Sequence, residues 1–358
     1  MKRRAGVECV AVKSFLGGRL RNLVLPQVSV SLLTDIAEAK GLQQLYVKQA
    51  PQVLRALRET ALVQSVESSN RIEGVTVAPE RLRLLVAGKA QPRDRSEEEI
   101  RGYRRALDLI HTHSGDLRIA PDLMLRLHRT IQDGSPDAGR WKRADNEIVE
   151  LRSGAPPRVR FRPVPAAATP RAVEDLCRSY HHAVDQERVQ PLVAVAAFVL
   201  DFLCIHPFRD GNGRVSRLLA HFALHQHGFE VGRYVSLERI VEESRREYYD
   251  ALEQSSKRWH RGQHDLLPWL DHFLTILRRA YRAFAQNSLA SHARGGKTAL
   301  VEIAVESLPE SFTVAELTRA CPGVSRDMIR RVLRAIQASG GVVCEGRGPG
   351  ARWRKQKR

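Results

Sequence analysis

Apolar residues recur every three to four positions along most of the chain, the spacing that gives a helix one hydrophobic face. Residues 31–39 and 54–66 follow this pattern, and further amphipathic segments lie at 103–110 and 123–131. Between residues 192 and 205 nearly every position is apolar, so this segment is expected to be a helix buried among the others. The pattern predicts a mainly α-helical body.

The period changes to two over one short stretch. Residues 148–152 and 158–162 alternate apolar and polar side chains on either side of a turn that contains two prolines, which predicts a β-hairpin. An isolated hairpin is only marginally stable in water. We therefore expect it to rest on the helical core or to serve as an edge for another chain.

The C-terminal region follows a polar, glycine-containing break at residues 288–296. Three short helices are predicted beyond this break, the second opened by a capping box at Thr313 and the third spanning 326–339. A basic hairpin follows, and this order is typical of a winged helix-turn-helix domain. The third helix carries Arg326, Arg330, Arg331 and Arg334. These arginines would suit DNA, whereas such domains also serve protein interaction, and the sequence leaves both open.

Residues 206–217 (HPFRDGNGRVSR), directly after the buried helix, hold the densest chemistry of the chain. Gly211 and Gly213 let the backbone turn sharply and aim its N–H groups at a ligand, and the helix that begins near Arg214 adds the positive end of its dipole. Arg214 and Arg217 are three residues apart, so both rise from the first helical turn. The segment therefore predicts an anion site in which two arginines hold phosphate groups.

Two further side chains of this segment supply reactive groups. Asp210 is a hard oxygen ligand at the place where a magnesium ion bridging phosphates would sit. His206 is a candidate general base for a hydroxyl. Earlier in the chain, Ser69 and Glu73 are four residues apart before Gly74, an arrangement that by itself indicates a helix end with a solvated carboxylate.

Charge and composition bear on the binding partners and the cellular compartment of the protein. The net charge is +18, to which residues 1–21 contribute +5 (six basic, one acidic) and residues 297–358 contribute +6 (twelve basic, six acidic). Basic ends attract nucleic acid, anionic lipid or acidic protein alike. The longest apolar run is about 14 residues, short of the ~20 that a membrane span needs, and the five cysteines show no disulfide or zinc spacing. We expect a cytoplasmic protein.

Residues 206–217 resemble the signature of the Fic family, whose fixed positions are a histidine, a phenylalanine, an acidic residue, Gly-Asn-Gly-Arg and a later arginine. All eight positions are present, as His206, Phe208, Asp210, Gly211, Asn212, Gly213, Arg214 and Arg217. The resemblance extends to a helical core at about 101–284, to the hairpin and to the C-terminal winged helix of many bacterial members. It implies a Fic-type helical bundle in which the hairpin is a flap that docks a target segment.

The resemblance implies transfer of AMP from ATP to a Ser, Thr or Tyr hydroxyl of a target protein, with release of pyrophosphate, and it leaves modification of the chain itself open. His206 would be the general base. Asp210 would hold Mg²⁺ on the α- and β-phosphates, while Gly211, Asn212 and Gly213 would cradle these phosphates.

The same resemblance gives roles to residues around this loop. Arg214 and Arg217 would neutralise the β- and γ-phosphates, and Phe208 would point into the core and fix the loop. Tyr248 and Tyr249 are candidates to flank the adenine.

Residues 69–74 take on a second interpretation, because Fic proteins commonly carry an inhibitory helix with Ser or Thr, three variable residues, Glu, and Gly or Asn. Ser69, Glu73 and Gly74 match it. The resemblance implies that Glu73 pairs with Arg217 and forces ATP into an unproductive pose. A glutamate beside the site could also orient water, so removal of AMP stays open.

We therefore expect an N-terminal helical region at 1–100 with the inhibitory helix at about 55–74, a Fic core at 101–287, a linker at 288–296 and a winged helix-turn-helix domain at 297–358. A DNA-binding regulator that uses the nucleotide site as a sensor is the alternative function. A scaffold with a decayed site is disfavoured by the eight intact positions. The target protein and the formation of a homodimer are left open.

Overall fold

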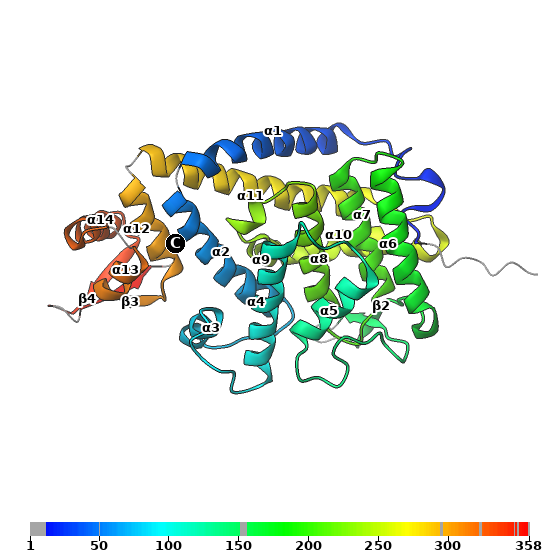
Figure 1. Ribbon diagram of the computed structural model, residues 1–358, viewed down its shortest axis with the longest axis horizontal. Helices are drawn as coiled ribbons and strands as arrows, with labels where there is room; N and C mark the ends of the chain where they lie inside the picture. Colours follow the sequence, from blue (N-terminus) through cyan, green and yellow to red (C-terminus); the bar gives the residue numbers. More distant parts are fainter. Residues whose placement is uncertain are drawn as a thin grey trace, which may run out of the picture.

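The computed structural model describes residues 12–49, 51–150, 156–293, 296–321, 324–346, 348 and 351–356 (Figure 1). Its helices are α1 (Gln27–Gln49), α2 (Pro51–Ile72), α3 (Pro79–Val86), α4 (Arg95–His113), α5 (Pro121–Ile131), α6 (Thr169–Asp185), α7 (Pro191–Ile205), α8 (Asn212–Gln226), α9 (Leu237–Glu243), α10 (Arg245–Ser256), α11 (Leu267–Ala293), α12 (Gly296–Ser307), α13 (Val314–Ala320) and α14 (Arg326–Ala338). Its strands are β1 (Ile148–Glu150), β2 (Arg158–Phe161), β3 (Ser311–Thr313), β4 (Val342–Glu345) and β5 (Arg352–Lys355). Within these described ranges, none of the helices combines the length and the apolar character that crossing a bilayer requires.

Helix α7 lies in the middle of the bundle because its sequence is apolar on every side. Helices α6, α8, α10 and α11 pack against it, and its side chains are almost all buried. Its single carboxylate, Asp201, is buried too, and accepts hydrogen bonds from Ser14 Oγ at 2.6 Å and Trp259 Nε1 at 2.5 Å. Ser14 thereby ties the segment before α1 to the body.

Helix α2 connects several parts of the molecule. It packs against α4 and α9, and its last turns reach the beginning of α8, the helix that opens within residues 206–217. Helix α1 lies along α11 at the top of Figure 1. The predicted mainly α-helical body is therefore confirmed, and its packing brings residues 69–74 to the segment at 206–217.

The predicted hairpin is present as the antiparallel pair β1 and β2, with Val149 opposite Val159 and Glu150 opposite Arg158. The predicted strand ends and turn at 151–155 lie outside the described residues. Val149 and Val159 are 44% and 40% exposed, so the hairpin presents apolar side chains to solvent instead of burying both faces. This exposed pair leaves an apolar surface beside the bundle.

The C-terminal elements bury Phe312, Leu317 and Leu333, which belong to the same hydrophobic cluster as the core of the bundle. This region contains helices α12, α13 and α14 and a three-stranded antiparallel sheet with the strand order β3-β5-β4. The capping box at Thr313 is present, because its Oγ1 accepts the N–H of Glu316 while the Glu316 carboxylate accepts the N–H of Thr313. Helix α12 packs against α2 and α11 (Figure 1, left).

Two polar segments are helical. Residues 95–99 open α4 despite their charged side chains, because the Asp94 side chain accepts the N–H of Glu97 at 2.9 Å and caps the helix. In the predicted linker at 288–296, α11 continues to Ala293 and α12 begins at Gly296. The helical propensity of the last turns of α11 outweighs its polar composition there.

Candidate functional site

His206 ends helix α7 and turns the chain toward the loop. Its backbone adopts the left-handed conformation (φ 50°, ψ 61°), and its N–H donates to the carbonyl of Phe202 at 2.9 Å. A non-glycine residue in this conformation is strained, and such strain concentrates at functional sites. Because α7 is buried and rigid, it places the His206 imidazole at a fixed point.

The loop after His206 is held by its own side chains. Asn212 accepts the N–H of Phe208 at 2.9 Å through Oδ1 and donates to the Phe208 carbonyl at 2.8 Å through Nδ2. Phe208 is fully buried, as expected, and stacks on His128 with ring centroids 3.8 Å apart. The Asn212 side chain is therefore committed to the loop, and only its backbone is free to face a ligand.

His128, a buried residue of α5, supports this loop through both ring nitrogens. Its Nδ1 accepts the N–H of Gly139 at 3.0 Å, and its Nε2 donates to the carbonyl of Asp210 at 3.1 Å. Burial lowers the pKa of His128 to about 4, which keeps the ring neutral and preserves these two opposite roles.

A cavity of about 580 Å³ opens beside the loop. It is lined by Glu73, Ile148, Val149, Arg160, Phe161, Leu200, Leu203, Cys204, His206, Gly213, Arg217, Arg245, Tyr248, Tyr249, Leu252 and Ser256. Six predicted site residues thus meet in one space, although they come from α2, α8 and α10 and from the end of α7. The hairpin closes one side of this cavity with an apolar wall.

The His206 ring is neutral and has a defined tautomer. Its Nδ1 lies 3.2 Å from the carbonyl oxygen of Leu203, to which it donates, so Nε2 carries the lone pair. Burial lowers the pKa of His206 to about 4. At neutral pH the ring can therefore accept a proton at Nε2.

Arg217 lines the cavity and forms hydrogen bonds with residues at the end of α2. Its Nη2 donates to Oε1 of Glu73 and to the carbonyl of Ser69, at 2.8 and 2.9 Å, and its Nε donates to Ser69 Oγ at 2.9 Å. The guanidinium is 7% exposed and the Glu73 side chain 28% exposed. The contact that the resemblance implied between Glu73 and Arg217 is present.

Glu73 also covers the start of α8. A Cβ built on Gly213 would collide with Oε1 of Glu73, so glycine is what allows the carboxylate this close to the helix. Gly74 follows with φ 83°, the left-handed conformation expected at a helix end. A helix N-terminus attracts anions, and the Glu73 carboxylate lies at this position.

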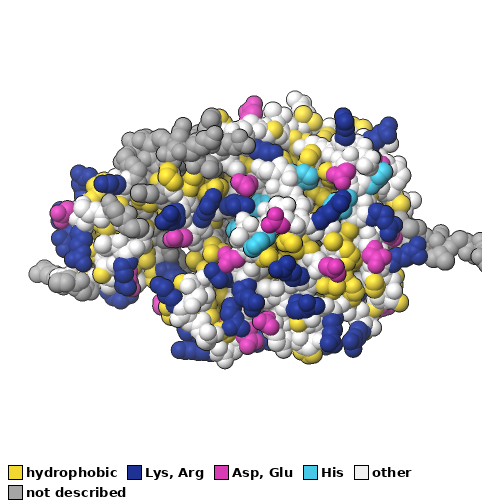
Figure 2. Space-filling view, in the orientation of Figure 1, with side chains coloured by type: hydrophobic (Ala, Val, Ile, Leu, Met, Phe, Trp, Pro, Cys, Tyr) yellow, Lys and Arg dark blue, Asp and Glu magenta, His cyan; other side chains and the backbone are white. Residues whose placement is uncertain are grey.

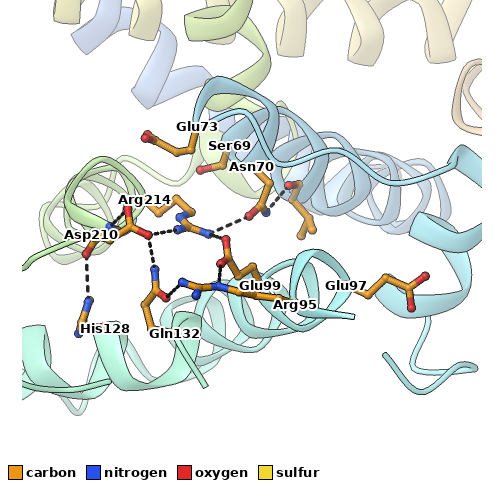
Figure 3. A network of polar contacts seen from close by, with 12 residues as sticks. Ser69, Asn70, Glu73, Arg95, Glu97, Glu99, His128, Gln132, Asp210 and Arg214 are labelled. Carbon is orange, nitrogen blue, oxygen red and sulfur yellow. Dashed lines mark hydrogen bonds and ion pairs between the residues drawn. The ribbon is translucent and has the colours of Figure 1, made fainter. Parts of the chain in front are cut away.

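Arg214, expected to hold phosphates, is not among the cavity residues. Figure 3 shows its guanidinium within a polar network between α2, α4 and the loop. It is paired with Glu99, lies 3.4 Å from Oδ1 of Asn70 and 3.7 Å from Oδ2 of Asp210, and is 1% exposed. Glu99 is buried on α4 and needs a counterion, which explains why Arg214 turns away from the cavity.

Asp210 lies at the edge of the same network, with its side chain 65% exposed. Its Oδ1 accepts the N–H of Gly211 at 2.6 Å, and its Oδ2 accepts Nε2 of Gln132 at 3.2 Å. It lines a second, smaller pocket with Gln132, Arg95 and Arg209. An exposed carboxylate held in place by two donors fits the single protein ligand that Mg²⁺ often takes beside substrate phosphates.

Tyr248 and Tyr249 both line the cavity, with ring centroids 5.3 Å apart. Burial raises the pKa of Tyr248 to about 12, so its hydroxyl stays protonated.

The sequence did not point to Arg160 and Arg245, which also line the cavity. Arg160 donates to the carbonyl of Tyr249 at 2.8 Å, and Arg245 to that of Ile72 at 3.0 Å. The alternation in β2 was the available signal for Arg160.

The fold and the loop at 206–217 define a Fic-type helical protein. Residues 118–224 match the Fic/DOC family, so this part of the chain is similar to a Fic domain. A Fic family protein from Desulfovibrio desulfuricans has the same fold, with a TM-score of 0.61, 21% identity and coverage of 94% of this chain and 98% of that one. Fic-1 from C. elegans aligns with a TM-score of 0.55, 22% identity and 75% coverage of each chain.

Curated relatives resemble parts of the sequence. The protein adenylyltransferase Fic of Nematostella vectensis is 26% identical over 214 residues, which are 56% of this chain and 45% of that protein. A Fido domain-containing protein of Dictyostelium discoideum is 57% identical over 37 residues, 10% of this chain and 26% of that protein. The matched regions thus span less than half of either relative.

Proposed function

We propose that the protein is an adenylyltransferase that moves AMP from ATP to a hydroxyl of a target protein and releases pyrophosphate. The name of the Nematostella relative and the meeting of His206, Gly213 and Arg217 in one cavity support this function. The observation that carries the proposal is the Glu73–Arg217 pair at 2.8 Å, because a carboxylate held by Arg217 beside the start of α8 supports binding of a phosphate there.

His206 acts as the general base. The target hydroxyl oxygen forms a bond to the α-phosphorus of ATP while Nε2 of His206 takes the hydroxyl proton, and the bond from the α-phosphorus to the bridging oxygen breaks. Pyrophosphate leaves with that electron pair. The Leu203 carbonyl holds the Nδ1 proton, so the basic lone pair remains on Nε2 throughout.

The phosphates bind where Glu73 now lies. The backbone N–H groups at Gly213 and the positive end of α8 hold them, and Arg217 neutralises the terminal charge. Asp210 provides the carboxylate ligand for Mg²⁺, which when bound offsets negative charge on the phosphates. Arg214 serves this arrangement indirectly, because it joins Asp210 to Glu99 at the core.

The carboxylate of Glu73, directly after α2, makes the resting enzyme autoinhibited. ATP can place its terminal phosphate on Arg217 only after Glu73 gives up that guanidinium. The exposed edge of the hairpin, with Val149 and Val159, is a fitting place for an extended target segment, since β1 already forms one wall of the cavity.

A label-transfer assay tests the proposed activity. The Glu73→Gly variant, with and without His206→Ala, is incubated with Mg²⁺ and ATP labelled at the α-phosphate, and labelled protein is measured in a bacterial lysate and on the chain itself. We expect label that disappears with His206→Ala. Parallel ATP labelled at the γ-phosphate should transfer nothing. Transfer of γ-label, or α-label that persists without His206, would contradict the proposal.

DNA binding is a second candidate function, favoured by α14. Arg326, Arg330, Arg331 and Arg334 are exposed on one side while Ile329, Val332 and Leu333 are buried on the other. Lys and Arg side chains gather at this end of the molecule (Figure 2, left). DNA affinity that falls steeply with salt, with a smaller salt slope in Arg331→Ala, would support a DNA-binding winged helix. Affinity absent at low salt would exclude it.

A further inference from the structure

Three histidines from two helices meet behind the candidate site. His221 and His225 are four residues apart on α8 and so share one face, and His111 faces them from the end of α4. One nitrogen from each ring can be chosen so that all three lie within 4.8 Å of one another. The ring centroids of His111 and His225 are 5.3 Å apart. This spacing is close to what three ligands around one ion require.

These imidazoles lack ordinary partners. Both ring nitrogens of His225 and Nε2 of His111 are buried and have no hydrogen-bond partner within the part of the chain that the structure describes. A buried polar atom without a partner is unfavourable, because it loses its hydrogen bonds to water and gains none in return. Such unpartnered nitrogens beside one another in a histidine cluster are unfavourable for simple core packing, and they indicate a missing ligand.

The cluster offers the type of ligand that a metal site needs. Neutral imidazole nitrogens are the ligands that zinc-type ions prefer. His221 has a carboxylate beside it, since its Nε2 lies 3.0 Å from Oε1 of Glu238, and Glu238 accepts a hydrogen bond from Tyr103 at 2.8 Å.

We propose that His111, His221 and His225 bind one zinc-type divalent ion that fastens α8 to α4. Glu238 sits where a carboxylate orients a metal-bound histidine and offsets the charge of the ion. The consequence for the protein is mechanical, because α8 also carries Arg217 and α4 also carries Glu99. The ion fixes the helix that supports the phosphate site from behind, without touching substrate.

Titration with Co²⁺ tests the site, because a tetrahedral site gives intense visible bands whereas an octahedral surface site gives weak ones. The full chain without an affinity tag is stripped with a chelator, titrated with Co²⁺ and then with Zn²⁺. Thermal unfolding is followed with and without each ion. His225→Gln removes one ligand, and His113→Gln, an exposed histidine on the same α4, is the matched control.

We expect about one ion per chain, intense Co²⁺ bands that Zn²⁺ displaces, and a rise in Tm on loading for the wild type and His113→Gln. His225→Gln should lower the affinity at least about tenfold and lose the bands. His111→Gln, at the more exposed edge of the cluster, repeats the comparison if His225→Gln does not fold. Weak octahedral bands in the wild type, or unchanged affinity in the ligand variants, would overturn the proposal.

Discussion

Replacing Glu73 by glutamine removes the negative charge that faces Arg217 while nearly keeping the shape of the side chain. The carboxylate accepts a hydrogen bond from the guanidinium at 2.8 Å, and Ser69 holds the same guanidinium independently. Arg217 should therefore keep its place in the variant. What changes is the competition between a protein carboxylate and a phosphate for one cation.

The size of the effect follows from the burial of this pair. A hydrogen bond to a charged group contributes about 1.5–3 kcal/mol, and about 1.4 kcal/mol corresponds to a tenfold change in binding. Because Glu73 is 28% exposed, solvent screens part of the interaction and favours the lower end of this range. We expect Glu73→Gln to bind a magnesium complex of a nonhydrolysable ATP analogue about tenfold more tightly.

Calorimetric titration measures this affinity. Glu67→Gln is the matched control. Glu67 lies on α2 and pairs with Arg71, so this variant removes one carboxylate outside the cavity and should bind the analogue like the wild type. In a Glu73→Gln, Arg217→Met double variant the gain should vanish. Equal affinities in the wild type and Glu73→Gln would refute the competition, as would a gain that survives the loss of Arg217.

Three further variants or conditions test the support of the site. Arg214→Met should lower the free energy of unfolding by about 3 kcal/mol, the lower end of the cost of breaking a buried pair, since it leaves the buried Glu99 paired only with the exposed Arg95. Adding Glu99→Leu should recover part of the loss in urea unfolding, and a double variant less stable than Arg214→Met would contradict the pairing. Phe208→Ala should cost about 3–5 kcal/mol and reduce label transfer, because the ring stacked on His128 holds the loop; an unchanged melting curve would show that the loop does not depend on it. Finally, the free energy of unfolding should fall as the pH drops from about 6.5 toward 4. In this range the unfolded chain binds protons at His128 and His206, whereas the folded protein does not, because both folded pKa values are about 4. Urea unfolding at pH 7.5, 6 and 5 measures this slope, and a flat profile would count against neutral buried histidines.

The sequence predicted the elements that depend on local pattern. The apolar run at 192–205 predicted the buried helix α7, and alternation predicted the hairpin whose strands are β1 and β2. The short strand β3 was missed, because three residues give too little alternation to detect. The opening of α4 was missed although Asp94 followed by Glu97 is a capping pattern, since Pro92 and the charges nearby favoured a loop.

Tertiary partners explain what the sequence left undetermined at the site. Asn212 has the right chemistry for a phosphate, but its amide closes the loop onto Phe208, a pairing visible only once both backbones are placed. The histidine cluster at His111, His221 and His225 was invisible for a similar reason. Only the packing of α4 on α8 brings its members together.

Arg214 and Arg217 show how far spacing alone can go. Three residues of an α-helix correspond to about 300°, so the two side chains leave α8 roughly 60° apart. That difference is enough to give them separate neighbours. Arg214 faces α4 and forms an ion pair with Glu99, whereas Arg217 faces the end of α2 and forms an ion pair with Glu73 at the cavity. Two arginines on one helical turn thus differ in their surroundings: Arg214 lies in a buried network with α4, and Arg217 lies at the cavity.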